Sequence, residues 1–218
     1  MMAALKAPAL AAYVLAAAQG CPAGPAPQLA FDFTVKKTAF VHALPAEDID
    51  RIRRKNAGKA GAGHLSGLTE TKFGHKAAIH GKETIRPDGW RCFRPVKVVV
   101  TLDYTPVVYI SSAYRAGSCK YAETRRHELQ HVAISKETVE EFAPVMMAQL
   151  RQAMKDMRAL GPGTEQQLRR GRDRMNKAIA AAYNKAMDEM MRVLAERQAR
   201  IDTDSEYRRV AGLCTGKD

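Results

Sequence analysis

The sequence predicts an α+β protein in which a small β-rich N-terminal half packs on a metal-binding helix and a long antiparallel helical hairpin. Two observations support this prediction: polar and apolar residues alternate in the first half, and after residue 118 the apolar period becomes helical. Strands followed by helices are typical of the α+β class. A chain of 218 residues, 46% of them hydrophobic, is long enough for one such domain, which we place at residues 31–214.

The first half contains the predicted strands. Residues 31–35 alternate, and residues 96–102 place Val or Leu at every second position. Residues 67–85 alternate more loosely and predict two short strands. We expect Thr105-Pro106 to end the strand at 96–102, because proline has no N–H for a strand ladder. A further strand then begins at residue 107.

Most of the predicted helices lie after residue 118, and one short basic helix lies within the strand half. Helices are predicted at 46–55, 119–134, 138–160 and 164–200, with a Gly-rich loop at 56–66. Thr138 and Thr164 each begin a capping-box pattern, in which a Glu or Gln follows three residues later. Gly161-Pro162-Gly163 lies between the two longest predicted helices and should separate them.

Residues 1–18 predict a secretory signal peptide. They combine a single cation, Lys6, an apolar run too short for a convincing membrane span, and alanines at 16–18 that fit a cleavage site. A Pro/Ala-rich spacer follows at residues 19–30. We therefore expect a secreted or periplasmic protein with no transmembrane span. Lipid attachment at Cys21 remains open as an alternative.

Four cysteines fit this predicted location. Cys21 lies at the processing site, and Cys92, Cys119 and Cys214 remain for disulfides, which allows three single bridges. We favour Cys92–Cys119, because both residues flank the predicted strand pair and both precede the metal helix. No C-x-x-C spacing is present, which argues against a cysteine metal site.

The most specific motif is His127-Glu128-Leu129-Gln130-His131, which reads H-E-x-x-H. On a helix the two imidazoles lie on one face, where both reach a single Zn²⁺ at about 2.0–2.1 Å. Zinc lowers the pKa of a bound water to about 7, and the intervening glutamate takes the proton of that water. We therefore assign His127 and His131 as zinc ligands and Glu128 as the catalytic general base.

The motif does not supply the third ligand that catalytic zinc usually takes. One candidate is Asp202, which lies in an acidic segment at the end of the last long helix, where that helix returns along its neighbour. Each such carboxylate is also suited to a helix cap or an ion pair. The alternatives are Glu206, Glu141 and Glu140, and outside these His75 and His80.

The order of the features resembles an uncharacterised bacterial family of predicted secreted zinc-dependent proteases. Trp90-x-Cys92, a strand, the H-E-x-x-H and a helical hairpin occur in that order, and Gln198-Ala-Arg-Ile-Asp202-Thr203 follows. The resemblance covers residues 31–214 and implies a zincin-type peptidase. Asp202 matches the Asp of the family, which makes Asp202 the first choice as third ligand. The Thr-x-His-Gly of the family is not present, and Glu206 and Tyr207 stand in its place.

We predict from these features an exported zinc metallopeptidase that acts on a peptide or protein substrate. Tyr207, Tyr114 and His80 are the candidate groups for stabilising the oxyanion. The alternative is a non-catalytic envelope protein with a structural or degenerate metal site, which binds a partner or an anionic polymer through its basic helices. The net charge of +12 permits such contacts. We expect no specific nucleic-acid partner, because the basic segments lack interleaved aromatic residues and any base-reading motif.

Overall fold

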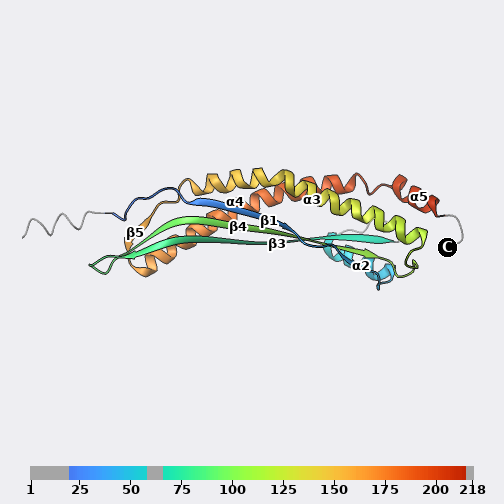
Figure 1. Ribbon diagram of the computed structural model, residues 1–218, viewed down its shortest axis with the longest axis horizontal. Coiled ribbons are helices and arrows are strands. Elements are labelled where there is room, and N and C mark those ends of the chain that lie inside the picture. The colour runs from blue at the N-terminus through green and yellow to red at the C-terminus, as the bar shows by residue number, and fades with distance from the viewer. Residues whose placement is uncertain (1–19, 58–65, 215–218) are drawn as a thin grey trace, which may run out of the picture.

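The structure is a computed structural model that describes residues 20–57 and 66–214. Its elements, in chain order, are β1 (Gln28–Val35), β2 (Ala39–Val41), α2 (Ala46–Ala57), β3 (Gly67–Ile85), β4 (Arg91–Ile110), α3 (Cys119–Met154), β5 (Leu160–Gly163), α4 (Glu165–Ala199) and α5 (Asp204–Leu213). The predicted mixture of helices and strands is confirmed, and the molecule is elongated (Figure 1). The predicted signal peptide and most of the Gly-rich loop lie outside the described residues.

Strand β4 is the centre of the sheet. β3 pairs with it antiparallel from one end to the other. The opposite edge of β4 is therefore shared by three shorter strands: β1 and β2 pair with it in parallel, and β5 pairs with it antiparallel near Arg91 and Phe93. The result is a narrow, very long sheet rather than a broad one (Figure 1).

The predicted breaks within the strand half are wrong. Residues 67–85 form one strand of 19 residues, and β4 continues through Thr105-Pro106 for 20 residues. β1 pairs with β4 up to Tyr104, and β2 begins its pairing at Val107. Pro106 therefore lies at a gap between two neighbouring strands, where a missing N–H disturbs the ladder least.

The predicted break in the metal helix is also wrong, since α3 runs for 36 residues without interruption. Thr138 does not cap a new helix, because its hydroxyl donates to the carbonyl of Ile134 within the same helix. Pro144 and Glu140, the residue whose carbonyl loses its helical partner, are both exposed residues of α3. The capping box at Thr164 is confirmed as the start of α4.

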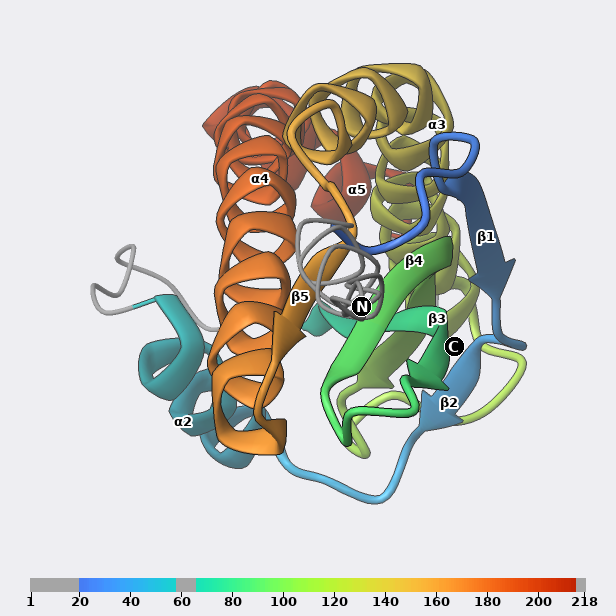
Figure 2. The ribbon, with the colours of Figure 1, turned by 90° about the vertical axis from the view of Figure 1, so that its left-hand side faces the viewer.

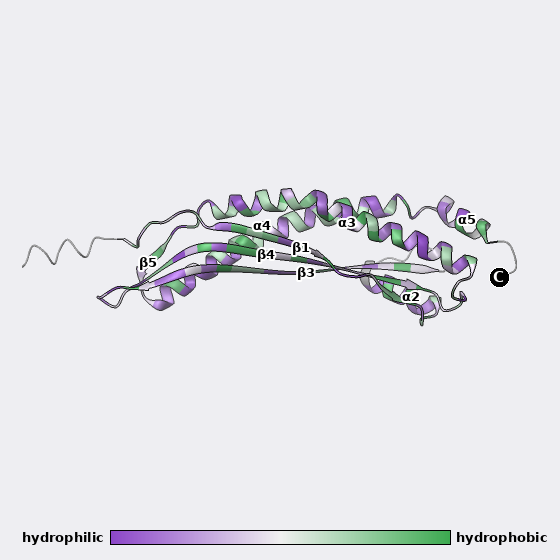
Figure 3. Ribbon diagram, viewed as in Figure 1, coloured by the Kyte–Doolittle hydropathy of each residue, from purple (hydrophilic) through white to green (hydrophobic). Residues whose placement is uncertain are grey.

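The predicted helical hairpin therefore consists of α3 and α4, which run side by side along the sheet (Figures 1 and 2). Hydrophobic and hydrophilic residues recur in short blocks along both helices (Figure 3). The buried members of these blocks meet the inner face of β4 in one core, which includes Val98, Val100, Leu102, Val139, Met146, Leu150, Leu168, Ile179, Tyr183 and Met190. The hairpin thus holds α3 against the sheet over the length of the molecule.

The predicted Cys92–Cys119 disulfide is wrong: Cys21 bonds to Cys92, and Cys119 bonds to Cys214. The unbroken β4 explains this, because 18 residues of strand separate Cys92 from Ile110, or about 60 Å. The Sγ of Cys21 is occupied by the disulfide and is not free for a lipid thioether. The presence of two disulfides is compatible with the predicted location outside the cytoplasm.

Within the part of the chain that the structure describes, no helix is both long and apolar enough to cross a lipid bilayer.

Candidate metal centre

The buried face of α3 is polar near the N-terminus of the helix and apolar further along. From Thr124 to Thr138 the buried side chains are polar, and they include His127, Glu128 and His131. Only 5% of His127, 5% of Glu128 and 8% of His131 is exposed. Polar groups buried in this way are costly unless they have partners, so their partners indicate what this stretch of helix does.

The two imidazoles meet a carboxylate from a distant part of the chain. Asp202 lies in the turn between α4 and α5, and its Oδ1 is 3.3 Å from His127 Nε2 and 3.1 Å from His131 Nε2. The two Nε2 atoms are 3.2 Å apart. Three possible ligand atoms, one from each side chain, therefore form a nearly equilateral triangle.

This triangle has the dimensions of a tetrahedral zinc site. When ligand atoms lie about 2.0–2.1 Å from a tetrahedral ion, they lie about 3.3–3.4 Å from one another. The three observed separations approach that value, and the donor set of two imidazoles and one carboxylate suits Zn²⁺. The residues present therefore fit a metal ion with three protein ligands, although the same donors also suit other transition metals.

The electrostatics of the cluster follow from its burial and its close contacts. Burial alone would raise the pKa of Asp202, but hydrogen bonds and charge from the two histidines outweigh it and hold that pKa well below its usual range. Burial opposes the charged form of His131, yet Asp202 raises the pKa of that ring above its ordinary value. Asp202 is therefore an anion at neutral pH, as a metal ligand must be.

Gln198, in the last turn of α4, orients the ring of His131. Its Nε2 donates to the backbone carbonyl of His131 at 3.0 Å and to Ser135 Oγ at 2.9 Å. These two bonds turn Gln198 Oε1 towards His131 Nδ1, with which it makes a hydrogen bond. Nδ1 is then the N–H donor, and the lone pair of Nε2 points at the triangle.

We expect Gln198→Leu to weaken zinc binding by about 10–100-fold, because it removes the acceptor that fixes the His131 tautomer. The measurement is competitive zinc titration against a chelating dye. Gln166→Leu is the matched control, since Gln166 is an exposed residue of the same helix. Equal affinity in the Gln198 and Gln166 variants would contradict the orienting role.

Glu206 lies behind His127 rather than among the possible ligand atoms. Its Oε1 is 3.6 Å from His127 Nδ1, a buried nitrogen that makes no hydrogen bond with any residue that the structure describes. Arg209 binds both carboxylate oxygens of Glu206 at 2.6 Å and lowers the pKa of Glu206 to about 2. An anchored carboxylate on the Nδ1 side of a histidine has the position of an orienting group for a metal ligand.

Glu128 extends from the same helix towards the start of β3. The hydroxyl of Thr69 lies 2.8 Å from Glu128 Oε2 and 2.9 Å from its backbone oxygen. Burial raises the pKa of Glu128 above its ordinary value, against the lowering effect of the two histidines and Thr69. Gly67 permits this approach, because a Cβ there would come within 2.6 Å of Glu128 Oε1.

Of the three candidate oxyanion groups, the structure brings Tyr207 to the cluster. Its hydroxyl donates to Asp202 Oδ1 at 3.2 Å, and partial burial together with the Asp202 charge raises the pKa of Tyr207 above its usual range. The phenol therefore stays protonated and able to donate. Neither Tyr114 nor His80 contacts the cluster in the described structure; the backbone oxygen of Tyr114 instead bonds to His42.

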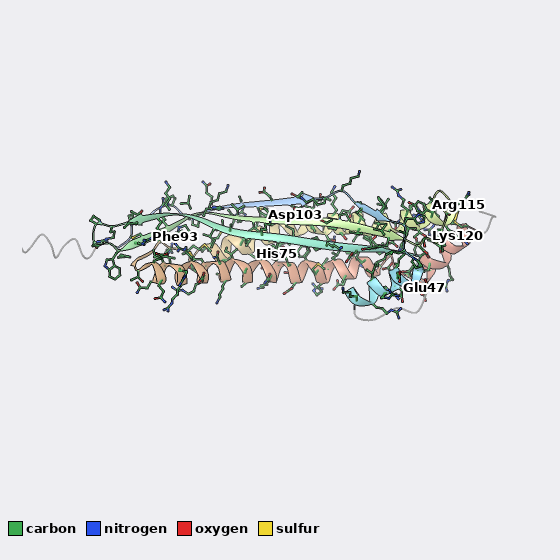
Figure 4. The ribbon with its side chains drawn as sticks, turned by 90° about the horizontal axis from the view of Figure 1, so that it is seen from below. Glu47, His75, Phe93, Asp103, Arg115 and Lys120 are labelled. Atoms are coloured by element: carbon green, nitrogen blue, oxygen red, sulfur yellow. A yellow bond between two sulfur atoms is a disulfide. The ribbon has the colours of Figure 1, made fainter. Side chains whose placement is uncertain are left out.

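The remaining alternative ligands lie elsewhere. Glu141 pairs with Arg197, and Glu140 pairs with Lys136 at 3.7 Å. His75 stacks on Tyr183 near the middle of β3, well away from the start of α3 (Figure 4). Within residues 20–57 and 66–214, His127, His131 and Asp202 form the one group of such side chains that is placed to hold a metal ion.

Two parts of the site were missed in the sequence. One is Gln198, whose role depends on the packing of α4 against α3. The other is α5, whose start carries a readable signal: Thr203 is followed three residues later by Glu206, and the Thr203 hydroxyl accepts from the Glu206 N–H. The Cys119–Cys214 disulfide fixes α5 to the first turn of α3.

Comparisons with known proteins give no match to a family model, to a curated protein or to a solved structure. The resemblance to secreted zinc-dependent proteases therefore stays a prediction, and the function is argued below from the site.

Proposed function

We propose that this protein is a zinc-dependent metallopeptidase, with His127, His131 and Asp202 as ligands and Glu128 as general base. The main support is the triangle of Nε2, Nε2 and Oδ1 atoms, which joins residues 71 and 75 positions apart in the chain. A buried carboxylate adjacent to the first histidine completes the set that peptide hydrolysis needs.

Each protein group has a defined part in this reaction. His127, His131 and Asp202 would hold the zinc ion, which would lower the pKa of a water and act as a Lewis acid towards the scissile carbonyl. Glu128 accepts a proton from the attacking water and delivers it to the leaving amine, while Thr69 holds its carboxylate in place. Gln198 keeps Nε2 of His131 available as a ligand. Tyr207 offers a neutral O–H close to the ligands, where the oxyanion develops.

The alternative is a non-catalytic envelope protein in which the same residues hold a structural metal ion. The burial of Glu128 and its hydrogen bond to Thr69 favour this alternative, because a carboxylate so placed can also serve to brace a helix against a strand. Metal binding alone does not distinguish the two functions, but peptide hydrolysis does.

The test combines metal content with cleavage of a broad peptide mixture. We expect about one zinc ion per purified chain, loss of cleavage after chelation, and recovery of cleavage when about one equivalent of zinc is returned. Cleavage that persists in the metal-free protein would exclude the proposed mechanism. Full zinc occupancy without cleavage of any peptide would favour the structural alternative.

A further inference from the structure

The end of the molecule opposite the metal centre carries exposed apolar side chains. β3 and β4 are joined there by a hairpin turn, where Ile85 is 62% exposed and Trp90 is 46% exposed. Trp90 is the single tryptophan of the chain. The turn projects as the tip of the long sheet (Figure 1). We call Ile85 to Trp90 the hairpin tip.

The hairpin tip is held in one conformation by its own hydrogen bonds. The N–H of Arg86 donates to the carbonyl of Trp90, and the N–H of Gly89 donates to the carbonyl of Arg86. Asp88 accepts from the Trp90 N–H, and Gly89 has a φ of 83°, which favours glycine. Trp90 is therefore presented by a fixed turn, so little conformational entropy is lost when it meets a partner.

The helical surface beside the tip is basic. α4 begins next to the hairpin, since Glu165 is 3.8 Å from Arg91 and Arg172 contacts both Glu83 and the ring of Phe93. The acidic residues near the hairpin turn already have partners: Glu83 pairs with Arg91 and Arg172, and Asp88 pairs with Arg86. Three arginines on the solvent side of the first turns of α4 make no ion pair with any described residue: Arg169, Arg170 and Arg174.

From this combination we infer that the hairpin tip and the adjacent turns of α4 dock on an anionic lipid bilayer. An exposed tryptophan suits the interface between headgroups and acyl chains, because its ring is apolar and its N–H is polar. Ile85 adds apolar area next to it. Each basic side chain near an anionic leaflet adds about a fivefold gain in binding.

The length of the sheet gives this docking a geometric consequence. Thr69 contacts Glu128, and 16 residues of β3 separate Thr69 from Ile85. At about 3.3 Å per residue, the metal centre lies about 50 Å from the hairpin tip. A protein docked by its tip therefore holds the metal centre well away from the lipid surface, whatever reaction takes place there.

Trp90 makes the inference directly testable, because all tryptophan fluorescence of the protein reports on the tip. The intact protein is mixed with vesicles of phosphatidylglycerol and, separately, of phosphatidylcholine. With phosphatidylglycerol we expect co-sedimentation at low salt, a blue shift of Trp90 emission and protection of Trp90 from acrylamide. With phosphatidylcholine we expect binding at least tenfold weaker.

Matched variants separate local docking from the general charge of the protein. The triple variant Arg169→Gln, Arg170→Gln, Arg174→Gln should lower binding to phosphatidylglycerol at least tenfold. The control triple variant Arg115→Gln, Lys120→Gln, Arg208→Gln removes the same charge from exposed positions at the other end and should bind as the unchanged protein does. Figure 4 shows Arg115 and Lys120 at that end, and Arg208 lies in α5, which Figure 1 shows there. Ile85→Ser should also weaken binding, whereas Met191→Ser, at another exposed apolar position, should not.

Four outcomes would overturn the inference. The first is equal binding to the two kinds of vesicle. The second is an equal loss of binding in the two triple variants, which would indicate attraction by net charge alone. The third is vesicle binding without any change in Trp90 emission, which would place the contact elsewhere. The fourth is tight binding to soluble polyphosphate with no binding to vesicles, which would make the partner an anionic polymer.

Discussion

Replacement of Glu128 by glutamine should leave zinc bound and abolish peptide cleavage. Glutamine has nearly the same shape and keeps an oxygen that accepts from Thr69, but it cannot take a proton from water. The loss expected for a general base is at least about 10²–10⁴-fold, while zinc content and thermal unfolding stay close to those of the unchanged protein. The measurement is cleavage rate and zinc content on the same preparations.

Glu140→Gln is the matched control for that experiment. Glu140 lies on the same helix, faces solvent and pairs only loosely with Lys136, so the same chemical change there should alter neither activity nor zinc. If Glu128→Gln cleaves as fast as the unchanged protein, Glu128 is not the base. If Glu128→Gln instead loses its zinc, the carboxylate acts on the metal rather than on a proton.

The second large effect concerns Asp202. Asp202→Asn removes the anionic oxygen that both histidines face, so zinc affinity should fall by more than the 10–100-fold expected for loss of an orienting residue such as Glu206. The His127→Ala, His131→Ala double variant should bind no zinc at this site. Competitive zinc titration of these two variants and of Glu206→Gln ranks ligands above orienting groups.

Two carboxylates serve as controls for the ligand assignment. Glu141→Gln and Glu140→Gln remove candidates that the structure places in surface ion pairs, so both should bind zinc normally. If Asp202→Asn retains full affinity while Glu206→Gln loses it, then Glu206 is the third ligand and the ring of His127 turns to present Nδ1. That result would contradict the assignment of Asp202.

The local features of the site could be predicted from the sequence. The spacing of His127 and His131 on one helical face follows from the helix itself. A returning helix brings the acidic segment of Asp202 back towards this face, and the resemblance to secreted zinc-dependent proteases favours Asp202 within that segment. Gln198 and Glu206 reach the proposed ligands only through the packing of α4 and α5 against α3. Such second-layer contacts depend on tertiary distances, which residue types do not encode locally.

The wrong predictions of a strand break, a helix break and a disulfide have a common physical cause. Thr105-Pro106 and the hydroxyl at Thr138 are local signals for a break, and in each place the tertiary structure removes the penalty: one lies at a gap between paired strands, and the other bonds back into its own helix. A strand broken at Thr105-Pro106 would allow Cys92 and Cys119 to lie close together. The continuous strand separates them, and the disulfide prediction failed with it.

The Cys119–Cys214 disulfide alters the size of the loop that the metal would close. Along the chain, 75 residues separate His127 from Asp202. Through the disulfide the path is shorter, with eight residues from His127 to Cys119 and twelve from Cys214 to Asp202. Closing a loop of about 20 residues rather than 75 costs about 1 kcal/mol less in chain entropy. The covalent bond and a metal ion would thus constrain the same segment, and a chain that had lost its ion would keep the proposed ligands within reach of the next one.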